Sequence, residues 1–123
     1  MAYQRIAIIG LGRVGGEFLR KMLPMRERGL IISICAQLSE TEGKALARDE
    51  GIPLGTVEDV LEQGEALDII FDLTGNADVR QQLRANLAAA ENRHTVVAPE
   101  NIAQFVWLVM GEELPEVHGR AGY

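Results

Sequence analysis

Glycines at positions 10, 12 and 15 constrain this chain more than any other feature of its sequence. They follow the apolar run 5–9, which is typical of a buried strand, and they precede apolar residues at helical spacing. In a strand that turns into a helix at G-x-G-x-x-G, Gly10 allows a tight turn and Gly15 lets the helix pack closely on the strand. Gly12 leaves the backbone open to a phosphate, which N–H groups at the helix start can bind. The pattern predicts a dinucleotide site; the alternative is that the glycines serve backbone geometry alone.

Strands and helices alternate along the rest of the chain. Apolar runs predict the strands, while capping residues, glycines and prolines mark where the helices begin and end. We expect strands at 5–9, 30–35, 52–54, 67–73 and 94–98, with 52–54 at a sheet edge because a proline cannot donate to a ladder. We expect helices from the glycine turn to Pro24, from a capping box of Ser39 and Glu42 to Gly51, from Thr56 or Glu58 to Gly64, from Asn76 over 77–91, and from Pro99 to Met110.

This alternation predicts an α/β fold: a Rossmann-like, doubly wound parallel sheet in three layers, with helices on both faces. Residues 1–110 form the expected domain and 111–123 a polar carboxy-terminal tail. Ligands of such sheets lie outside the carboxyl ends of the strands. The expected cofactor-binding residues therefore follow three strands: Gly10, Leu11, Gly12, Arg13, Val14 and Gly15; Ala36 and Gln37; and Leu73, Thr74, Gly75 and Asn76.

The segment at the end of the fourth predicted strand has two interpretations. Thr74 and Asn76 could contact a ribose or a nicotinamide, or the segment could be a plain turn in which Asn76 caps the next helix. Asp72, on a mostly apolar strand, is expected to face the strand edge and to accept backbone N–H bonds.

The choice between NAD and NADP depends on the end of the second strand. NAD-binding domains place an acid there, which accepts from the 2′-hydroxyl of the ribose. Here residues 35–39 read Cys-Ala-Gln-Leu-Ser, and the first carboxylate is Glu40. Arg13 could stack on adenine or meet a 2′-phosphate, helped by Ser39 and Lys44, or it could be a solvated loop arginine. The preference stays open and slightly favours NADP.

Composition excludes several other classes of protein. A net charge of −6 and an aromatic content of 5% do not favour nucleic acid or anionic lipid as a partner. The apolar runs are too short to span a bilayer, and the first residues do not resemble a signal peptide. A single cysteine, Cys35, excludes an internal disulfide and fits the cytoplasm. Two histidines and one cysteine, far apart in sequence, do not predict a metal site.

The chain resembles the amino-terminal dinucleotide-binding domain of homoserine dehydrogenase, aspartate dehydrogenase and dihydrodipicolinate reductase, and it is similar to the Gfo/Idh/MocA oxidoreductases. The matching segments span nearly all of residues 5–110: 8–15 (IIGLGRVG), Leu46-Ala47 before 51–53 (GIP), 67–76 (LDIIFDLTGN) and 94–97 (HTVV). Two further segments, 72–80 (DLTGNADVR) and 105–108 (FVWL), resemble stand-alone or sensor-fused Rossmann domains of anaerobic bacteria. The resemblance implies a domain that binds NAD or NADP.

The sequence departs from the dehydrogenase pattern where that pattern carries a lysine after the fifth strand, because the matching stretch here is Ala-Pro-Glu-Asn at 98–101. His94 and Glu100 are candidates for acid–base work, but the sequence favours a surface histidine and an early-helix acid stabilised by the helix dipole, so no catalytic residue is assigned. About 120 residues also leave no room for a substrate domain. We expect a stand-alone NAD(P)-binding module with a sensing or regulatory role. The alternatives are a homoserine dehydrogenase-like oxidoreductase fragment or subunit completed by another chain, and an interaction domain with a decayed site.

The last predicted helix is apolar on more than one face. A stripe of Ile102, Phe105, Val106 and Val109 is expected to pack on the sheet, which leaves Trp107, Leu108 and Met110 on the other side. Such a patch usually marks a contact. We therefore expect a homodimer, or docking of a partner protein, through this helix.

Overall fold

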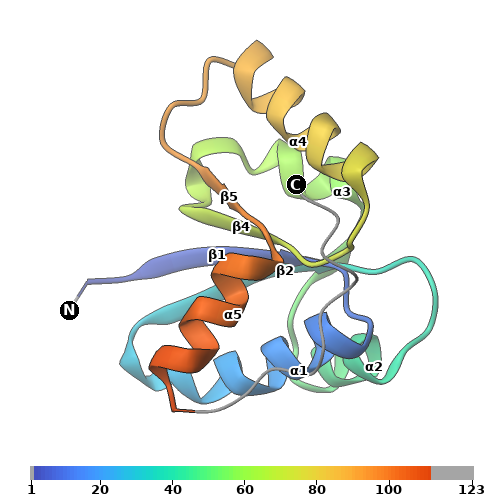
Figure 1. Ribbon diagram of the computed structural model, residues 1–123, viewed down its shortest axis with the longest axis vertical. Helices are drawn as coiled ribbons and strands as arrows, with labels where there is room; N and C mark the ends of the chain where they lie inside the picture. Colours follow the sequence, from blue (N-terminus) through green and yellow to red (C-terminus); the bar gives the residue numbers. More distant parts are fainter. Residues whose placement is uncertain (1, 112–123) are drawn as a thin grey trace.

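The computed structural model describes residues 2–111, and in this part of the chain five parallel strands form one sheet in the order β3-β2-β1-β4-β5 (Figure 1). The tail expected at 111–123 lies, from residue 112 on, outside the described residues. The strands are β1 (Gln4–Ile9), β2 (Leu30–Ala36), β3 (Leu54–Gly55), β4 (Ile69–Asp72) and β5 (Val96–Ala98). The α-helices are α1 (Arg13–Met22), α2 (Glu42–Asp49), α3 (Val57–Glu62), α4 (Ala77–Ala89) and α5 (Glu100–Val109).

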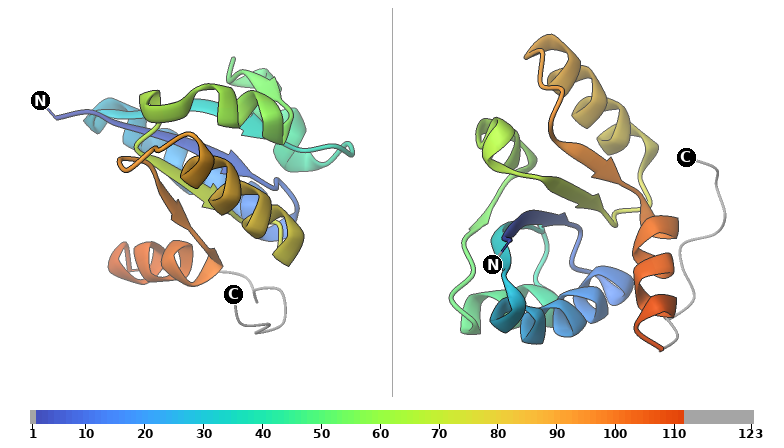
Figure 2. Two further views of the ribbon diagram at one scale, coloured as in Figure 1. Left: turned by 90° about the horizontal axis from the view of Figure 1, so that it is seen from above. Right: turned by 90° about the vertical axis from the view of Figure 1, so that its left-hand side faces the viewer.

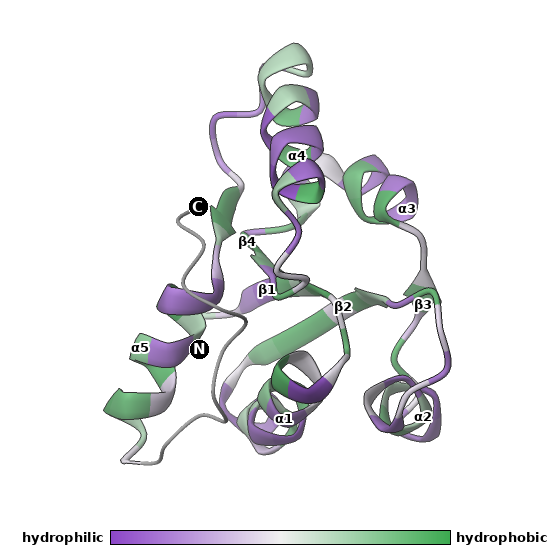
Figure 3. Cartoon of the chain, turned by 45° about the vertical axis from the view of Figure 1, so that its right-hand side comes forward, coloured by the Kyte–Doolittle hydropathy of each residue, from purple (hydrophilic) through white to green (hydrophobic). Residues whose placement is uncertain are grey.

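The helices cover both faces of the sheet, which confirms the predicted three layers. Figure 2 shows α3 and α4 on one side, and α1, α2 and α5 on the other. Alternate residues of a strand point to opposite faces. Ile6 and Ile8 of β1 accordingly belong to the apolar cluster under α1 and α5, while Ala7 and Ile9 belong to the cluster under α3 and α4. Burial on both faces explains why the central strands carry long apolar runs, and the colouring of β2 in Figure 3 shows one of them.

Local signals placed the element ends to within about two residues; the largest difference in register is at β3, which is Leu54–Gly55 where 52–54 was expected. Asn76 caps α4, as predicted, and of the two residues expected to begin α3, Thr56 and Glu58, Thr56 is the cap, in a capping box with Asp59. The cap of α2 is Thr41 and not Ser39, because the Thr41 hydroxyl both accepts from the N–H of Lys44 (3.0 Å) and donates to the carbonyl of Leu11 (2.7 Å).

Two prolines sit slightly differently from the prediction. As predicted, α1 ends just before Pro24, at Met22, but the chain continues into a 3₁₀ helix (Leu23–Arg28). Pro24 lies in the first turn of that helix, where a missing N–H costs nothing. Pro99 is the N-cap of α5 and not its first helical residue.

The orientation predicted for α5 is wrong. The side chains that face the interior are Glu100, Ala103 and Trp107, and Trp107 joins the apolar cluster that contains Phe18 and Met22 of α1. The expected inward stripe lies largely outside: Ile102 is 42% exposed, Phe105 63% and Val109 71%. A helix that is apolar all round has no periodicity that selects one face, so the fit of Ala103 and Trp107 to the sheet and α1 decided the orientation.

Two further searches of residues 2–111 complete the description. No helix in this range is long and apolar enough to cross a membrane. No three of its histidine, cysteine, aspartate and glutamate side chains are grouped so that they could hold a metal ion. Cys35 is buried in the sheet, and this burial raises the pKa of its thiol to about 12.

Candidate functional site

The three motif glycines have different roles in the turn between β1 and α1. Gly10 has a φ of +95°, and a Cβ there would lie 2.9 Å from the carbonyl of Leu73. A Cβ on Gly15 would lie 1.7 Å from the carbonyl oxygen of Gly10, so both residues must be glycine for the fold. Gly12 has a φ of −75°, and nothing lies within 4 Å of the position its Cβ would take. Backbone geometry therefore explains Gly10 and Gly15 but not Gly12, whose missing side chain keeps a space open beside the start of α1.

Leu11, which lies between Gly10 and Gly12 in this turn, is held in place by side chains from the loop between β2 and α2. The backbone N–H of Leu11 donates to Oε1 of Gln37 (2.6 Å), and its carbonyl accepts from the hydroxyl of Thr41 (2.7 Å). Gln37 in turn donates through Nε2 to Oγ of Ser39 (3.1 Å). These bonds join the glycine turn and the β2–α2 loop into one unit.

A cavity of about 560 Å³ opens at the carboxyl ends of the strands, directly beside the glycine turn. Seven of the twelve expected cofactor-binding residues line it: Gly10, Gly12, Ala36, Gln37, Leu73, Thr74 and Asn76. Residues that the sequence analysis did not include also line it: Ile9, Leu38, Ser39, Gly55, Thr56, Val57, Glu58, Val79 and Gln82. The order of the strands would have indicated these residues. Because β3 pairs with β2 in parallel, the loop after β3 leaves the sheet at the same edge as the loop after β2.

The other five expected residues lie near the cavity without lining it. Leu11, Val14 and Gly15 are buried behind the turn, where they support its shape. Gly75, with a φ of +67°, forms the bend between Thr74 and Asn76. Arg13 lines a neighbouring hollow of about 240 Å³ between α1 and α2.

The segment after β4 is ordered by a buried ion pair. Asp72 is fully buried, and its carboxylate accepts from Nε of Arg80 (3.3 Å) and from the hydroxyl of Thr74 (2.7 Å). It also accepts from the backbone N–H of Thr74, as predicted, but it lies in the interior and not at an exposed strand edge. The hydroxyl of Thr74 thus donates its hydrogen bond to Asp72, and its oxygen already accepts one from the backbone N–H of Asn76 (3.0 Å). Toward a ligand it can therefore act only as an acceptor, through its remaining lone pair. Asn76 caps α4 through Oδ1, which leaves the amide nitrogen as its donor.

Among the described residues that line the cavity, Glu58 alone carries a charge. Its carboxylate accepts from its own backbone N–H and from Nε2 of Gln82 (3.2 Å), and these hydrogen bonds lower the pKa of Glu58. Lys44 lies outside the cavity lining, where Nζ donates to the carbonyl of Leu38 (3.1 Å) and lies 3.5 Å from Glu40. Glu58 thus lines the cavity, whereas Arg13 and Lys44, the basic residues considered for a 2′-phosphate, do not.

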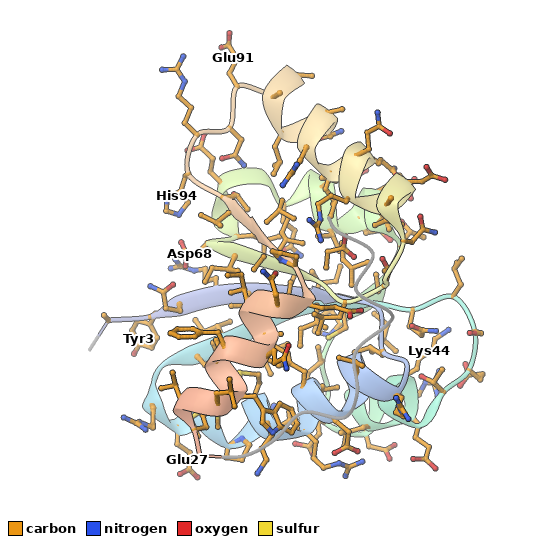
Figure 4. All side chains as sticks on the ribbon, viewed as in Figure 1. Tyr3, Glu27, Lys44, Asp68, Glu91 and His94 are labelled. Carbon is orange, nitrogen blue, oxygen red and sulfur yellow. The ribbon has the colours of Figure 1, made fainter. Side chains whose placement is uncertain are left out.

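The two candidates for acid–base work lie elsewhere. Nε2 of His94 is 2.6 Å from Oδ1 of Asp68, whose other oxygen accepts from the N–H of Arg5 (2.7 Å). These residues join the amino ends of β1, β4 and β5, the sheet edge opposite the cavity; Figure 4 shows His94 and Asp68 together, far across the molecule from Lys44. Glu100 follows β5 and is buried, and it does not line the cavity.

The fold and the arrangement of its turn define a Rossmann-like α/β domain. Solved structures of homoserine dehydrogenase are similar to it: the S. aureus enzyme, with a TM-score of 0.61, 17% identity and 92% of this chain covered, and the Thiobacillus denitrificans enzyme, with a TM-score of 0.55, 27% identity and 90% covered. The match takes in 32% and 27% of those chains, so this chain spans between about a quarter and a third of their length. The resemblance to the amino-terminal domain of homoserine dehydrogenase is thereby confirmed. No family model and no curated protein matches the chain.

Proposed function

We propose that this domain binds a nicotinamide dinucleotide in the cavity at the carboxyl ends of its strands. The observation that carries the proposal is Gly12, where neither φ nor a neighbouring atom requires a glycine and where the open space borders the cavity. A diphosphate lying over Gly12 would meet the start of α1, whose first N–H groups have no partner within the helix. Side chains cap α2, α3 and α4, whereas α1, which begins after Gly12, and α5, which begins after Pro99, have no side-chain cap; of these two, α1 starts beside the cavity.

The rest of the cavity suits the two ends of such a ligand. The loops after β2 and β3 would hold the adenosine half, with Gln37, Ser39 and Thr56 at its sides. Thr74 and Asn76 would face the nicotinamide half, the first as an acceptor and the second as a donor. The bound nicotinamide ring supplies the capacity to give or take a hydride, while the domain's residues bind and orient the cofactor.

We further propose that this domain holds the dinucleotide without completing a hydride-transfer site, as a nucleotide-sensing or cofactor-carrying module. Within residues 2–111 the single charged group that lines the cavity is Glu58, at the end assigned to adenosine, and His94 lies at the opposite edge of the sheet. The alternative is the cofactor domain of a homoserine dehydrogenase-like oxidoreductase whose substrate-binding part comes from elsewhere. The similar homoserine dehydrogenases are about three times as long as this chain, and this difference in length supports the alternative.

Calorimetric titration of the chain with NAD, NADH, NADP and NADPH tests the proposal. We expect at least one of them to bind, and no detectable binding of any at millimolar concentration would refute it. An absorbance assay at 340 nm with homoserine and each oxidised cofactor separates the two roles. The binding-module role predicts no turnover by the pure chain, whereas robust reduction of the cofactor would support the oxidoreductase.

We also propose that two copies of the chain associate through the outer face of α5, formed by Ile102, Phe105, Leu108 and Val109. These four side chains are between 42% and 71% exposed, and together they form an exposed apolar patch on one side of α5. Contiguous apolar patches of this kind often mark a contact with another protein. The segment 101–110 contains no charged residue, although the chain has a net charge of −6. We choose a second copy of the chain as the partner because this face carries no charge. Across a two-fold axis each residue near the axis meets its own equivalent, so a charged face would bring like charges together, and this face avoids that repulsion.

A further inference from the structure

The geometry points to Glu58 as the residue that makes this cavity select a dinucleotide without a 2′-phosphate, NAD(H) over NADP(H). This inference rests on the proposed dinucleotide site and names the class of ligand that the site takes. It reverses the slight preference for NADP that the sequence suggested.

Glu58 reaches the cavity because of the order of the strands. β3 pairs with β2, with Cys35 opposite Leu54 and Ala36 opposite Gly55, so the loops that follow the two strands lie side by side. The capping box of Thr56 begins α3 immediately after β3 and sets Glu58 in the first turn of that helix. Gln82 of α4 then holds the carboxylate at 3.2 Å. Glu58 therefore faces the same space as Gln37 and Ser39 of the β2–α2 loop.

The usual position for an acid in an NAD site, at the end of β2, is occupied here by Gln37. Its carboxamide binds the N–H of Leu11 and the hydroxyl of Ser39. A glutamine so engaged keeps the glycine turn in place but brings no negative charge to the ribose. Glu58 provides that charge from the first turn of α3, the helix that follows the neighbouring strand β3. A carboxylate there can accept hydrogen bonds from ribose hydroxyls or from the adenine amino group.

The same carboxylate disfavours an added phosphate. NADP differs from NAD by a phosphate at the adenosine ribose, and phosphate sites in proteins are normally lined by arginine or lysine. The described lining of this cavity contains no basic residue. In the neighbouring hollow, Arg13 and Arg20 are balanced by Glu17 and Glu42, and Arg20 lies 3.6 Å from Glu17.

The experiment measures the selectivity, defined as the Kd for NADP divided by the Kd for NAD, by calorimetry on the complete chain. We expect the unchanged chain to bind NAD at least about tenfold more tightly than NADP. Glu58→Gln keeps the size and hydrogen-bonding capacity of the side chain and removes its charge. Because Glu58 is solvent-exposed, we expect the selectivity to fall by about five- to tenfold, mainly through tighter binding of NADP.

The matched control is Glu62→Gln, which removes the same charge from an exposed residue of the same helix that does not line the cavity. Its selectivity should equal that of the unchanged chain. A Glu58→Gln variant with unaltered selectivity overturns the inference, as does an unchanged chain that prefers NADP and loses that preference in Arg13→Gln. If the chain binds neither NAD nor NADP, the proposed dinucleotide site itself is overturned. If it binds both with equal affinity, the site stands and the inference about Glu58 is overturned.

Discussion

The carboxamide oxygen of Gln37 lies 2.6 Å from the backbone nitrogen of Leu11 and accepts its hydrogen bond, across 26 positions of sequence. Leu11 is the residue between the first two motif glycines, and it is fully buried. Its N–H has a partner only because the β2–α2 loop supplies a side chain. The shape of the proposed phosphate turn therefore depends on the loop that lines the adenosine end of the cavity.

Gln37→Met should destabilise the domain and weaken dinucleotide binding. Methionine fills similar space but cannot accept from the buried N–H of Leu11, and an unsatisfied buried donor costs about 1–3 kcal/mol. Gln37→Glu keeps the acceptor and should retain most of the stability. Urea denaturation and calorimetric titration measure the two effects. Equal stability of the methionine and glutamate variants would show that the hydrogen bond has no such role.

Gly12→Val should abolish dinucleotide binding while the domain stays folded. The new side chain would occupy the open space over the turn, where no protein atom opposes it. Gly12→Ala should have a smaller effect in the same direction. Gly15→Ala is the contrasting variant, because its Cβ would collide with the carbonyl of Gly10 and should unfold the domain. Circular dichroism melts report folding, and titration reports binding. Normal affinity in Gly12→Val would place the ligand elsewhere.

Asp68→Asn should flatten the pH dependence of stability on the acid side. The N–H of Arg5 and the ring of His94 hydrogen-bond the carboxylate and lower the pKa of Asp68 below its ordinary value of 3.8. The folded state therefore binds the proton less readily than the unfolded state. The stabilisation is fully present above the ordinary pKa and is lost as the pH falls through the lowered one.

Thermal melts between pH 2 and pH 6 measure this effect. The unchanged chain should lose stability more steeply below about pH 4 than Asp68→Asn does. Asp49→Asn, at an exposed position on α2, serves as the control and should follow the unchanged chain. Identical acid limbs for the two variants would contradict the assigned role of Asp68.

Phe105→Glu should prevent self-association and leave the fold intact, since Phe105 is 63% exposed on the outer face of α5. Trp107→Glu should instead unfold the domain, because Trp107 is 4% exposed and a charge there would be buried among apolar side chains. Sedimentation velocity at micromolar concentrations measures the first effect, with Gln81→Glu on exposed α4 as a control for the added charge. A chain that stays monomeric to about 100 μM has no dimer of the standard interface type.

The sequence by itself determined the strand–turn–helix at Gly10 to Gly15, the alternation of five strands and helices, and the two caps at Thr56 and Asn76. Each of these depends on residues close together in the chain. The positive φ of Gly10, the apolar runs that form the strands and the side-chain caps are local consequences of composition and spacing. For the same reason the sequence identified the cavity residues that follow β1 and β4, such as Gly12 and Thr74.

Only the tertiary structure decided what depends on neighbours that are distant in sequence. The pairing of β3 with β2 brought Glu58 and Val57 to the cavity, and the packing of the β2–α2 loop on the glycine turn made Thr41, and not Ser39, the cap of α2. The face of α5 that is buried depended on which side chain, Trp107 or Phe105, could fill the space beside α1. Hydrophobic periodicity cannot answer that question for a helix that is apolar on all sides, because burial depends on the shape of the surface it meets.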